Sequence, residues 1–184
     1  MALKTFKSYT KSVRGTVLVD KSDLWKGKPL KSLTIGKSST GGRNNLGRIT
    51  SRRQGAGHKK RYRIVDFYRN KDDVTAKIER IEYDPNRSAY VALIKYEDGI
   101  QNYITAPNKI KVGDEVVSGR NKDIKIGNCM PLSDIPAGTN IHNIEMSNNS
   151  GAKLARSAGA YAQVSGSVDN YTIIKLSSGE TRKI

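Results

Sequence analysis

The segment AYVALIKYEDGIQNYIT, residues 89–105, contains two apolar runs joined by Asp98-Gly99. Asp and Gly both tolerate positive φ, so this dipeptide between apolar runs is typical of a tight β-hairpin turn. We therefore predict strands at Ala89–Tyr96 and Gln101–Thr105. This hairpin makes an all-β structure the first hypothesis for the chain.

Similar short runs lie on both sides of the hairpin, with turn signals about every ten residues. Strands are predicted at Tyr62–Tyr68 and Thr75–Tyr83, and the turn Asp84–Arg87 has proline at its second position, as β-turns favour. A fifth strand is predicted within Lys109–Gly119, after a turn. Five short strands in about 60 residues match an OB-type barrel in size.

A second group of short apolar runs follows. It predicts strands at Thr139–Met146, Ala160–Ser165, Tyr171–Leu176 and Thr181–Ile184, with a turn near Asp169. The last pattern continues to the final residue. Because unpaired strand edges invite aggregation and small barrels close by pairing their strands, we expect this second unit to be incomplete.

Positive charge is concentrated in the first third of the chain. Of the formal net charge of +16, residues 1–63 contribute +15, from 17 Lys and Arg against 2 acidic residues. The remaining 16 Lys and Arg face 15 acidic residues, a net charge of +1. This asymmetry indicates a cationic arm attached to a nearly neutral folded body. Such an arm needs a polyanion, and nucleic acid is favoured over an anionic membrane surface.

The composition of the arm favours RNA. Glycine permits close backbone approach, and arginine offers a planar donor fork for phosphates. Gly, Arg, Lys, Ser and Thr together suit an extended segment that becomes ordered on RNA. The loop Ser147–Tyr161, with Lys153 and Arg156, has the same character and could reach phosphates. A membrane-surface protein would instead predict an amphipathic basic helix, which the glycines disfavour.

A free single-stranded nucleic-acid binder is a further alternative. It would need aromatic side chains on the face of the first barrel, on which bases could stack. The available residues are Tyr62, Phe67, Tyr83, Tyr90, Tyr96 and Tyr103, several of which the alternation assigns to the core.

The sequence offers no enzyme active site. The single cysteine, Cys129, excludes an internal disulfide, and with His58 and His142 it makes no plausible zinc set. Phosphate-loop and nucleophile-elbow motifs are absent from the sequence. The longest apolar run, residues 90–94, is far below the roughly 20 residues of a membrane helix. We expect no catalysis, no cofactor other than Mg²⁺ ions held by a bound RNA, and no membrane partner.

Four long motifs resemble the universal ribosomal protein L2 family, in its bacterial or organellar form. They are residues 41–67, 81–89, 126–146 and 154–164. The resemblance implies a basic N-terminal extension at residues 1–60, an OB-fold barrel at 61–121 and an SH3-like barrel at 122–184. It also implies a structural role in translation: binding large-subunit rRNA, and supporting subunit assembly, subunit association and the architecture around the peptidyl-transferase centre. Neighbouring ribosomal proteins are the other expected partners.

The resemblance also transfers rRNA-contacting positions to this chain. In the extension they are Arg43, Asn44, Arg48, Arg52, Arg53, His58, Lys59, Lys60, Arg61 and Arg63. In the loop of the first barrel they are Arg87 and Ser88, and in that of the second barrel Lys153, Arg156 and Ser157.

Two departures from the family pattern affect what can be transferred. Ala56 stands where the family has the middle of three glycines, and a positive φ there would strain it. The sequence also has no counterpart of the family's C-terminal tail or of its histidine associated with peptide-bond formation. We therefore hypothesise a split protein completed by a separate polypeptide, with a truncated chain as the alternative.

Location is predicted from composition. Split genes favour an organelle, and the abundance of Lys, Asn, Ile, Ser and Tyr favours an AT-rich genome. We predict the large ribosomal subunit of the mitochondrial matrix, with the bacterial cytoplasm as the alternative. Residues 1–19 hold four basic and no acidic residues, which could mimic a transit peptide. A basic arm of the mature protein is the favoured interpretation of that segment.

Overall fold

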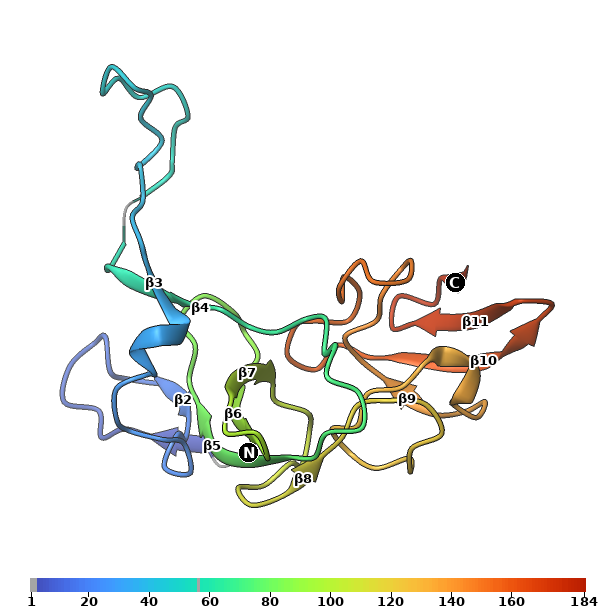
Figure 1. Cartoon of the computed structure of the whole chain (residues 1–184). Helices are drawn as coiled ribbons and strands as arrows, with labels where there is room; N and C mark the ends of the chain where they lie inside the picture. Colours follow the sequence, from blue (N-terminus) through green and yellow to red (C-terminus); the bar gives the residue numbers. More distant parts are fainter. Residues whose placement is uncertain (1–2, 56) are drawn as a thin grey trace.

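The computed structural model describes residues 3–55 and 57–184, and these form strands and loops (Figure 1). Over this part of the chain the helical elements are two short 3-10 turns, η1 at Lys31–Leu33 and η2 at Leu132–Asp134. None of the helices described is long and apolar enough to cross a membrane. The predicted all-β class is confirmed.

The first barrel contains a four-stranded antiparallel sheet in the order β7-β6-β5-β8. Its strands are β5 (Ala76–Glu82), β6 (Val91–Tyr96), β7 (Gln101–Thr105) and β8 (Glu115–Val116). The predicted hairpin is confirmed, because β6 pairs with β7 and Gly99 takes a φ of 83° in the turn between them.

The strand predicted at Tyr62–Tyr68 is wrong as one barrel element. Its first part is β4 (Lys60–Arg63), which pairs with β3 (Thr34–Lys37) of the arm, so that Tyr62 lies opposite Ile35. Further along, Val65 forms a single parallel bridge to Tyr103 of β7. The chain then turns, because Oδ1 of Asp66 accepts hydrogen bonds from the backbone N–H groups of Tyr68 and Arg69.

Strand β6 is buried on both faces, which explains its unbroken apolar sequence. Ala92, Ile94 and Tyr96 belong to the main core of the first barrel, with residues of β5, β7 and β8. Val91 and Leu93 face a second cluster with Val65 and Tyr103, and the partly buried residues packed on it are Leu30, Leu33 and Phe67. The root of the arm therefore covers one face of the barrel.

The second barrel contains the sheet β12-β11-β10-β9, with a small core at Ile144, Ala162 and Ile174. Its strands are β9 (Asn140–Ile141), β10 (Ala162–Val168), β11 (Tyr171–Leu176) and β12 (Thr181–Lys183). The strand predicted at Thr139–Met146 is too long, because Asn143 takes a φ of 52° and ends the regular pairing. The predicted strand at the final residues is present as β12, paired with β11.

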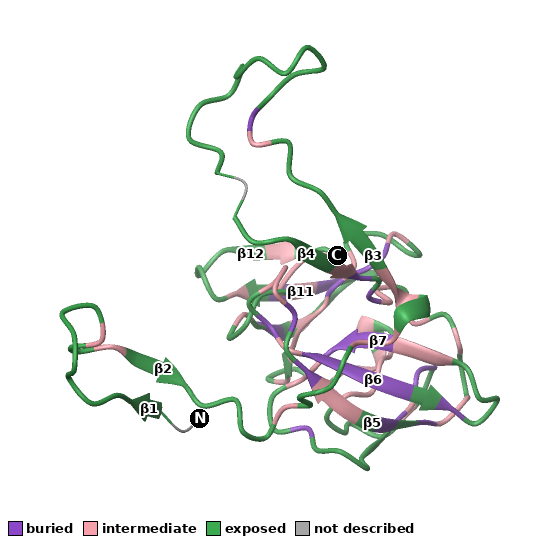
Figure 2. Cartoon of the chain, turned by 90° about the vertical axis from the view of Figure 1, so that its left-hand side faces the viewer, coloured by how far each residue is buried: buried purple, intermediate pink, exposed green. Residues whose placement is uncertain are grey.

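The arm has more structure than the sequence predicted. Strands β1 (Leu3–Thr5) and β2 (Val17–Val19) form one antiparallel pair, and β3 with β4 forms another. Beyond β3 and β4 a long loop projects away from both barrels, and almost all of it is exposed (Figure 2). Ala56, which a positive φ would strain, lies outside the described residues. The predicted domain boundaries stay a prediction.

Candidate nucleic-acid interface

Two buried carboxylates organise three arginines beside the first barrel. Glu82, at the end of β5, is 2% exposed and Asp84 is fully buried. Glu82 accepts hydrogen bonds from Arg63 Nε at 3.3 Å and Arg80 Nε at 2.8 Å. Asp84 accepts one from Arg87 Nε at 2.6 Å and lies 3.7 Å from Arg63 Nη1. Charges buried in this way persist only when paired, so the guanidinium positions are fixed.

The hydroxyl of Tyr103 ties this network to the arm. It donates to Glu82 Oε1 at 2.8 Å and accepts from the backbone N–H of Leu30 at 3.0 Å. Burial raises the pKa of Tyr103, which keeps it protonated as the donor that the network needs. The network thus joins β5, β7 and the root of the arm.

Arg63 is the most deeply buried of the predicted rRNA contacts. Its side chain is 10% exposed and bound to both buried carboxylates. Its role in the structure is to hold β4 on the barrel, and the sequence missed this because nothing local pairs it with Glu82 or Asp84.

A hollow of about 680 Å³ lies between the two barrels. The first barrel contributes Tyr62, Phe67, Asn86, Arg87 and Ser88 to its lining, and the second contributes Lys153, Leu154, Ala155, Arg156, Ser157 and Ala160. The lining has three cations and no acid. The five residues predicted from the two barrel loops are therefore brought together. Ser88 of the first loop and Lys153 of the second are 65 positions apart in the sequence.

Phe67 lies between cations from the two barrels. Arg156 Cζ is 4.0 Å from the ring centroid, and Arg87 Cζ is 5.8 Å away. Arg87 is also 5.5 Å from the ring of Tyr62. Cation–π attraction holds guanidinium groups on ring faces. Phe67 and Tyr62 were considered as stacking residues in the sequence, but their partnership with these arginines was not predicted.

Backbone N–H groups of the second loop donate hydrogen bonds to the first barrel. The N–H of Ala158 donates to Ser88 Oγ at 3.1 Å, and the N–H of Ala152 donates to the Phe67 carbonyl at 3.0 Å. Ser88 thus acts partly as a structural link. The loops are held at a set spacing, so the cations of both barrels line the same hollow.

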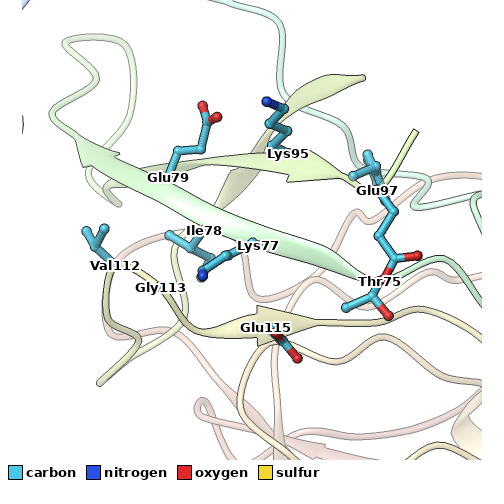
Figure 3. Close-up of a pocket in the computed structure, with 10 residues that line it drawn as sticks. Thr75, Lys77, Ile78, Glu79, Lys95, Glu97, Val112, Gly113 and Glu115 are labelled. Atoms are coloured by element: carbon cyan, nitrogen blue, oxygen red, sulfur yellow. The ribbon is translucent and has the colours of Figure 1, made fainter. Parts of the chain in front are cut away.

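A second hollow, of about 670 Å³, lies on β5, β6 and β8 and has a different character (Figure 3). Lys77 and Lys95 line it together with Glu79, Glu97 and Glu115. The acids outnumber the cations, so this lining disfavours a polyanion. The hollow between the barrels is therefore the better candidate for nucleic acid.

The remaining predicted contacts lie along the arm. Arg43, Asn44, Arg48, Arg52 and Arg53 are exposed in its outer part, and His58, Lys59, Lys60 and Arg61 are exposed on the limb that leads back to the barrel. Asn44 is partly committed, because its Oδ1 accepts the N–H groups of Leu46 and Arg48, each at 3.0 Å. The predicted residues thus form two groups, one on the arm and one around the hollow.

Comparison with known proteins identifies the family of the chain. Residues 30–118 match the family model "Ribosomal Proteins L2, RNA binding N-terminal domain", and residues 125–184 match "Ribosomal Proteins L2, C-terminal domain". The chain is 64% identical over 184 residues to "Large ribosomal subunit protein uL2" of Granulibacter bethesdensis, covering 100% of this chain and 67% of that protein. The chain belongs to the ribosomal protein L2 family.

Other L2 family members are similar over the same extent. The protein of the same name from Pelagibacter ubique is 61% identical over 185 residues, which is all of this chain and 66% of that protein. That of Rickettsia rickettsii is 60% identical over 184 residues and 67% of its length. The chain thus spans about two thirds of the length of the L2 relatives it matches.

Cys129, His58 and His142 are not grouped together in the described part of this L2 chain. No group of three potential metal-binding side chains occurs within residues 3–55 and 57–184. Burial raises the pKa of the Cys129 thiol, which keeps it protonated and unreactive. Burial, with Arg69 nearby, lowers the pKa of His142 and keeps its ring neutral.

Proposed function

We propose that this chain is a structural rRNA-binding protein of the large ribosomal subunit, without catalysis of its own. The observation that carries the proposal is the acid-free hollow, where Arg87 and Arg156 from two barrels flank Phe67. Arginine forks bind phosphates, and guanidinium planes and aromatic rings are groups on which unpaired bases stack. L2 family membership supports the same function.

The arm and the hollow make different contributions to RNA binding. Exposed arm cations neutralise phosphates and supply affinity that falls steeply with salt. The hollow, fixed by the carboxylate network and the loop hydrogen bonds, sets the register of the RNA on the barrels. Mg²⁺ ions would belong to the folded RNA and need no protein ligand cluster.

A direct test replaces both arginines of the hollow with glutamine, Arg87→Gln and Arg156→Gln. We expect the double variant to bind a protein-free large-subunit rRNA transcript at least tenfold more weakly, because charge-assisted bonds to phosphate are lost. Because Arg87 also pairs with the buried Asp84, Arg156→Gln alone is measured beside it and should bind more weakly with an unchanged melting temperature. Arg182→Gln is the matched control, because Arg182 is exposed and pairs with Glu180 in the second barrel. Equal affinity of the double variant and the control would overturn the proposal.

The structure does not favour the free single-stranded binder or the membrane-surface protein. Tyr96 and Tyr103 are buried at 2% and 0% exposure, and Lys21 Nζ lies 3.6 Å from the centroid of Tyr83. Burial keeps Tyr96 and Tyr103 from stacking on bases, whereas Tyr83 is exposed with one ring face beside Lys21. An amphipathic basic helix, which a membrane-surface protein would need, is absent from the described part of the arm.

Within the large subunit, the finer roles are also proposals. Support of subunit association and of the peptidyl-transferase region, with neighbouring ribosomal proteins as partners, rests on family membership. The mitochondrial location rests on composition alone, and the bacterial relatives favour the bacterial alternative. The separate polypeptide stays a prediction. Sedimentation of native lysate at high salt, with mass spectrometry of each fraction, tests association with the large subunit and reports the length of the chain.

A further inference from the structure

The outer end of the arm, residues 41–54, is folded by its own hydrogen bonds. We call this segment the arm tip. The N–H of Asn44 donates to the Arg48 carbonyl at 2.9 Å, and the N–H of Gly47 donates to the Asn44 carbonyl at 3.0 Å. Gly42 accepts from the N–H groups of Thr50 and Ser51 at 3.0 and 3.1 Å. The arm tip therefore has a defined shape although neither barrel supports it.

Two close contacts require the residue types found there. Gly42 has a φ of 74°, and a Cβ on it would lie 2.0 Å from the Ser51 carbonyl oxygen. The side chain of Asn44 closes the turn by accepting from Leu46 and Arg48. Such a turn holds Leu46 in place before any ligand arrives, which lowers the entropy cost of binding.

Leu46 is unusually exposed for an apolar residue in a structured turn. At 73% it has the largest exposed fraction among the exposed Leu, Ile and Val residues of the described chain. Ile49, which lies across the turn and bridges to Arg43, is 60% exposed. An apolar side chain displayed on a preformed loop indicates a surface that becomes buried on a partner.

The charges around Leu46 indicate what that partner is. The arm tip contains Arg43, Arg48, Arg52 and Arg53, all exposed, and no acid occurs between Asp23 and Asp66. The partner must therefore combine dense negative charge with flat apolar surfaces. Unpaired nucleotides of a folded RNA present phosphates beside open base faces, and apolar side chains wedge against bases in nucleic-acid complexes.

We propose that Leu46 is an apolar wedge that packs on an unpaired base of the rRNA. Asn44 and Gly42 position it, and the arginines of the arm tip hold the flanking phosphates. The wedge adds an apolar, salt-independent contribution to a segment whose other contacts are electrostatic. This inference rests on the proposed function, because it assumes that the ligand is rRNA.

The salt dependence of binding separates the wedge from the charges. The full chain is titrated with a protein-free large-subunit rRNA transcript over a series of salt concentrations. We expect Leu46→Ala to bind about tenfold more weakly at every salt concentration, since alanine removes most of the apolar surface that Leu46 would bury against the base. Its slope of log affinity against log salt is unchanged. Arg48→Gln instead lowers the magnitude of that slope by about one phosphate contact.

Two controls and one variant that tests the positioning of Leu46 complete the set. Val112→Ala removes a side chain that is 59% exposed on the first barrel, and it should bind as the wild type does. Leu46→Met keeps the apolar surface and should retain most of the affinity. Asn44→Ala should lose affinity as Leu46→Ala does, with the same melting temperature as the wild type, because the arm tip lies outside the cores.

Base-specific chemical probing of the rRNA supplies a second readout. One unpaired base protected by the wild type should regain its reactivity with Leu46→Ala and keep its protection with Arg48→Gln at saturating protein. Equal affinity of Leu46→Ala and Val112→Ala for rRNA would overturn the wedge and would assign Leu46 to a protein neighbour. If the double variant at Arg87 and Arg156 also binds like the wild type, the proposed function fails as well, so the two failures are distinguishable.

Discussion

The carboxylate network gives a quantitative prediction for Glu82→Gln. In the wild type, Glu82 accepts from Arg63 Nε, Arg80 Nε and Tyr103 Oη, at 3.3, 2.8 and 2.8 Å. Glutamine has the same shape but no charge, and its amide N–H₂ must face one of these donors. Each possible orientation leaves a buried donor without an acceptor.

The expected loss of stability follows from burial. Removing one partner of a buried ion pair costs about 3–5 kcal/mol, because the other charge stays buried. Arg80 is 21% exposed, so water can replace part of its interaction, whereas Arg63 is 10% exposed. We therefore take the lower end, about 3 kcal/mol, which in a chain of this size lowers the melting temperature by about 6–12 °C.

Trp25 offers a built-in probe for this measurement. It is the single tryptophan of the chain, its backbone N–H donates to the Ile81 carbonyl at 2.8 Å, and its ring centroid lies 4.9 Å from Arg80 Cζ. Urea unfolding followed by tryptophan fluorescence therefore reports on the first barrel. The control, Glu180→Gln, breaks an exposed pair and should cost about 0.5 kcal/mol or less. A Glu82→Gln midpoint equal to that of the control would refute the argument.

Three other predictions concern the interface, the arm and pH. Phe67→Leu removes the ring between the two guanidinium groups, and filter binding should show rRNA affinity reduced about threefold to tenfold with an unchanged salt slope. Gly42→Ala places a methyl group against a carbonyl oxygen at positive φ, so rRNA affinity should fall while tryptophan-monitored unfolding stays as in the wild type. His142 has a folded-state pKa below its unfolded value of 6.5, so the stability of its neutral form is present above pH 6.5 and lost as pH falls through the lowered pKa. Near-ultraviolet circular dichroism should therefore show urea midpoints that fall below pH 6.5 in the wild type and fall less in His142→Gln.

Local patterns predicted the barrels well and the contacts between distant segments poorly. The β6–β7 hairpin follows from a turn dipeptide and two apolar runs, all within residues 89–105. The loop bearing Lys153 and Arg156 was also visible, because Gly and Ala flank the cations. What the sequence could not supply was the pairing of β3 with β4, or the salt bridges of Arg63 to Glu82 and Asp84. These depend on which segments meet in space, and residue type alone does not specify that.

The same limit applies to the candidate site. The resemblance supplied Arg87 and Arg156 as separate positions in two loops. The hollow that they share depends on long-range hydrogen bonds, which Ser88 and Phe67 accept from the second loop. Arg63 is basic like its exposed neighbours, but its side chain is buried against two carboxylates. Composition could therefore predict the charge of the interface but not which arginines remain free to bind RNA.

The cover that the arm root places on β6 sets an order of events during synthesis. The hydrogen bond from Leu30 to Tyr103 joins residues 73 positions apart, and the cluster around it needs Val91 and Leu93. The arm leaves the synthesising ribosome first, but its root has nothing to pack on until β6 and β7 have followed. Because such long-range contacts form late, the most cationic part of the chain is not packed on a barrel during the first stage of synthesis. The arm is therefore exposed to any nearby polyanion, or to a chaperone that shields it, before the barrel can hold its root.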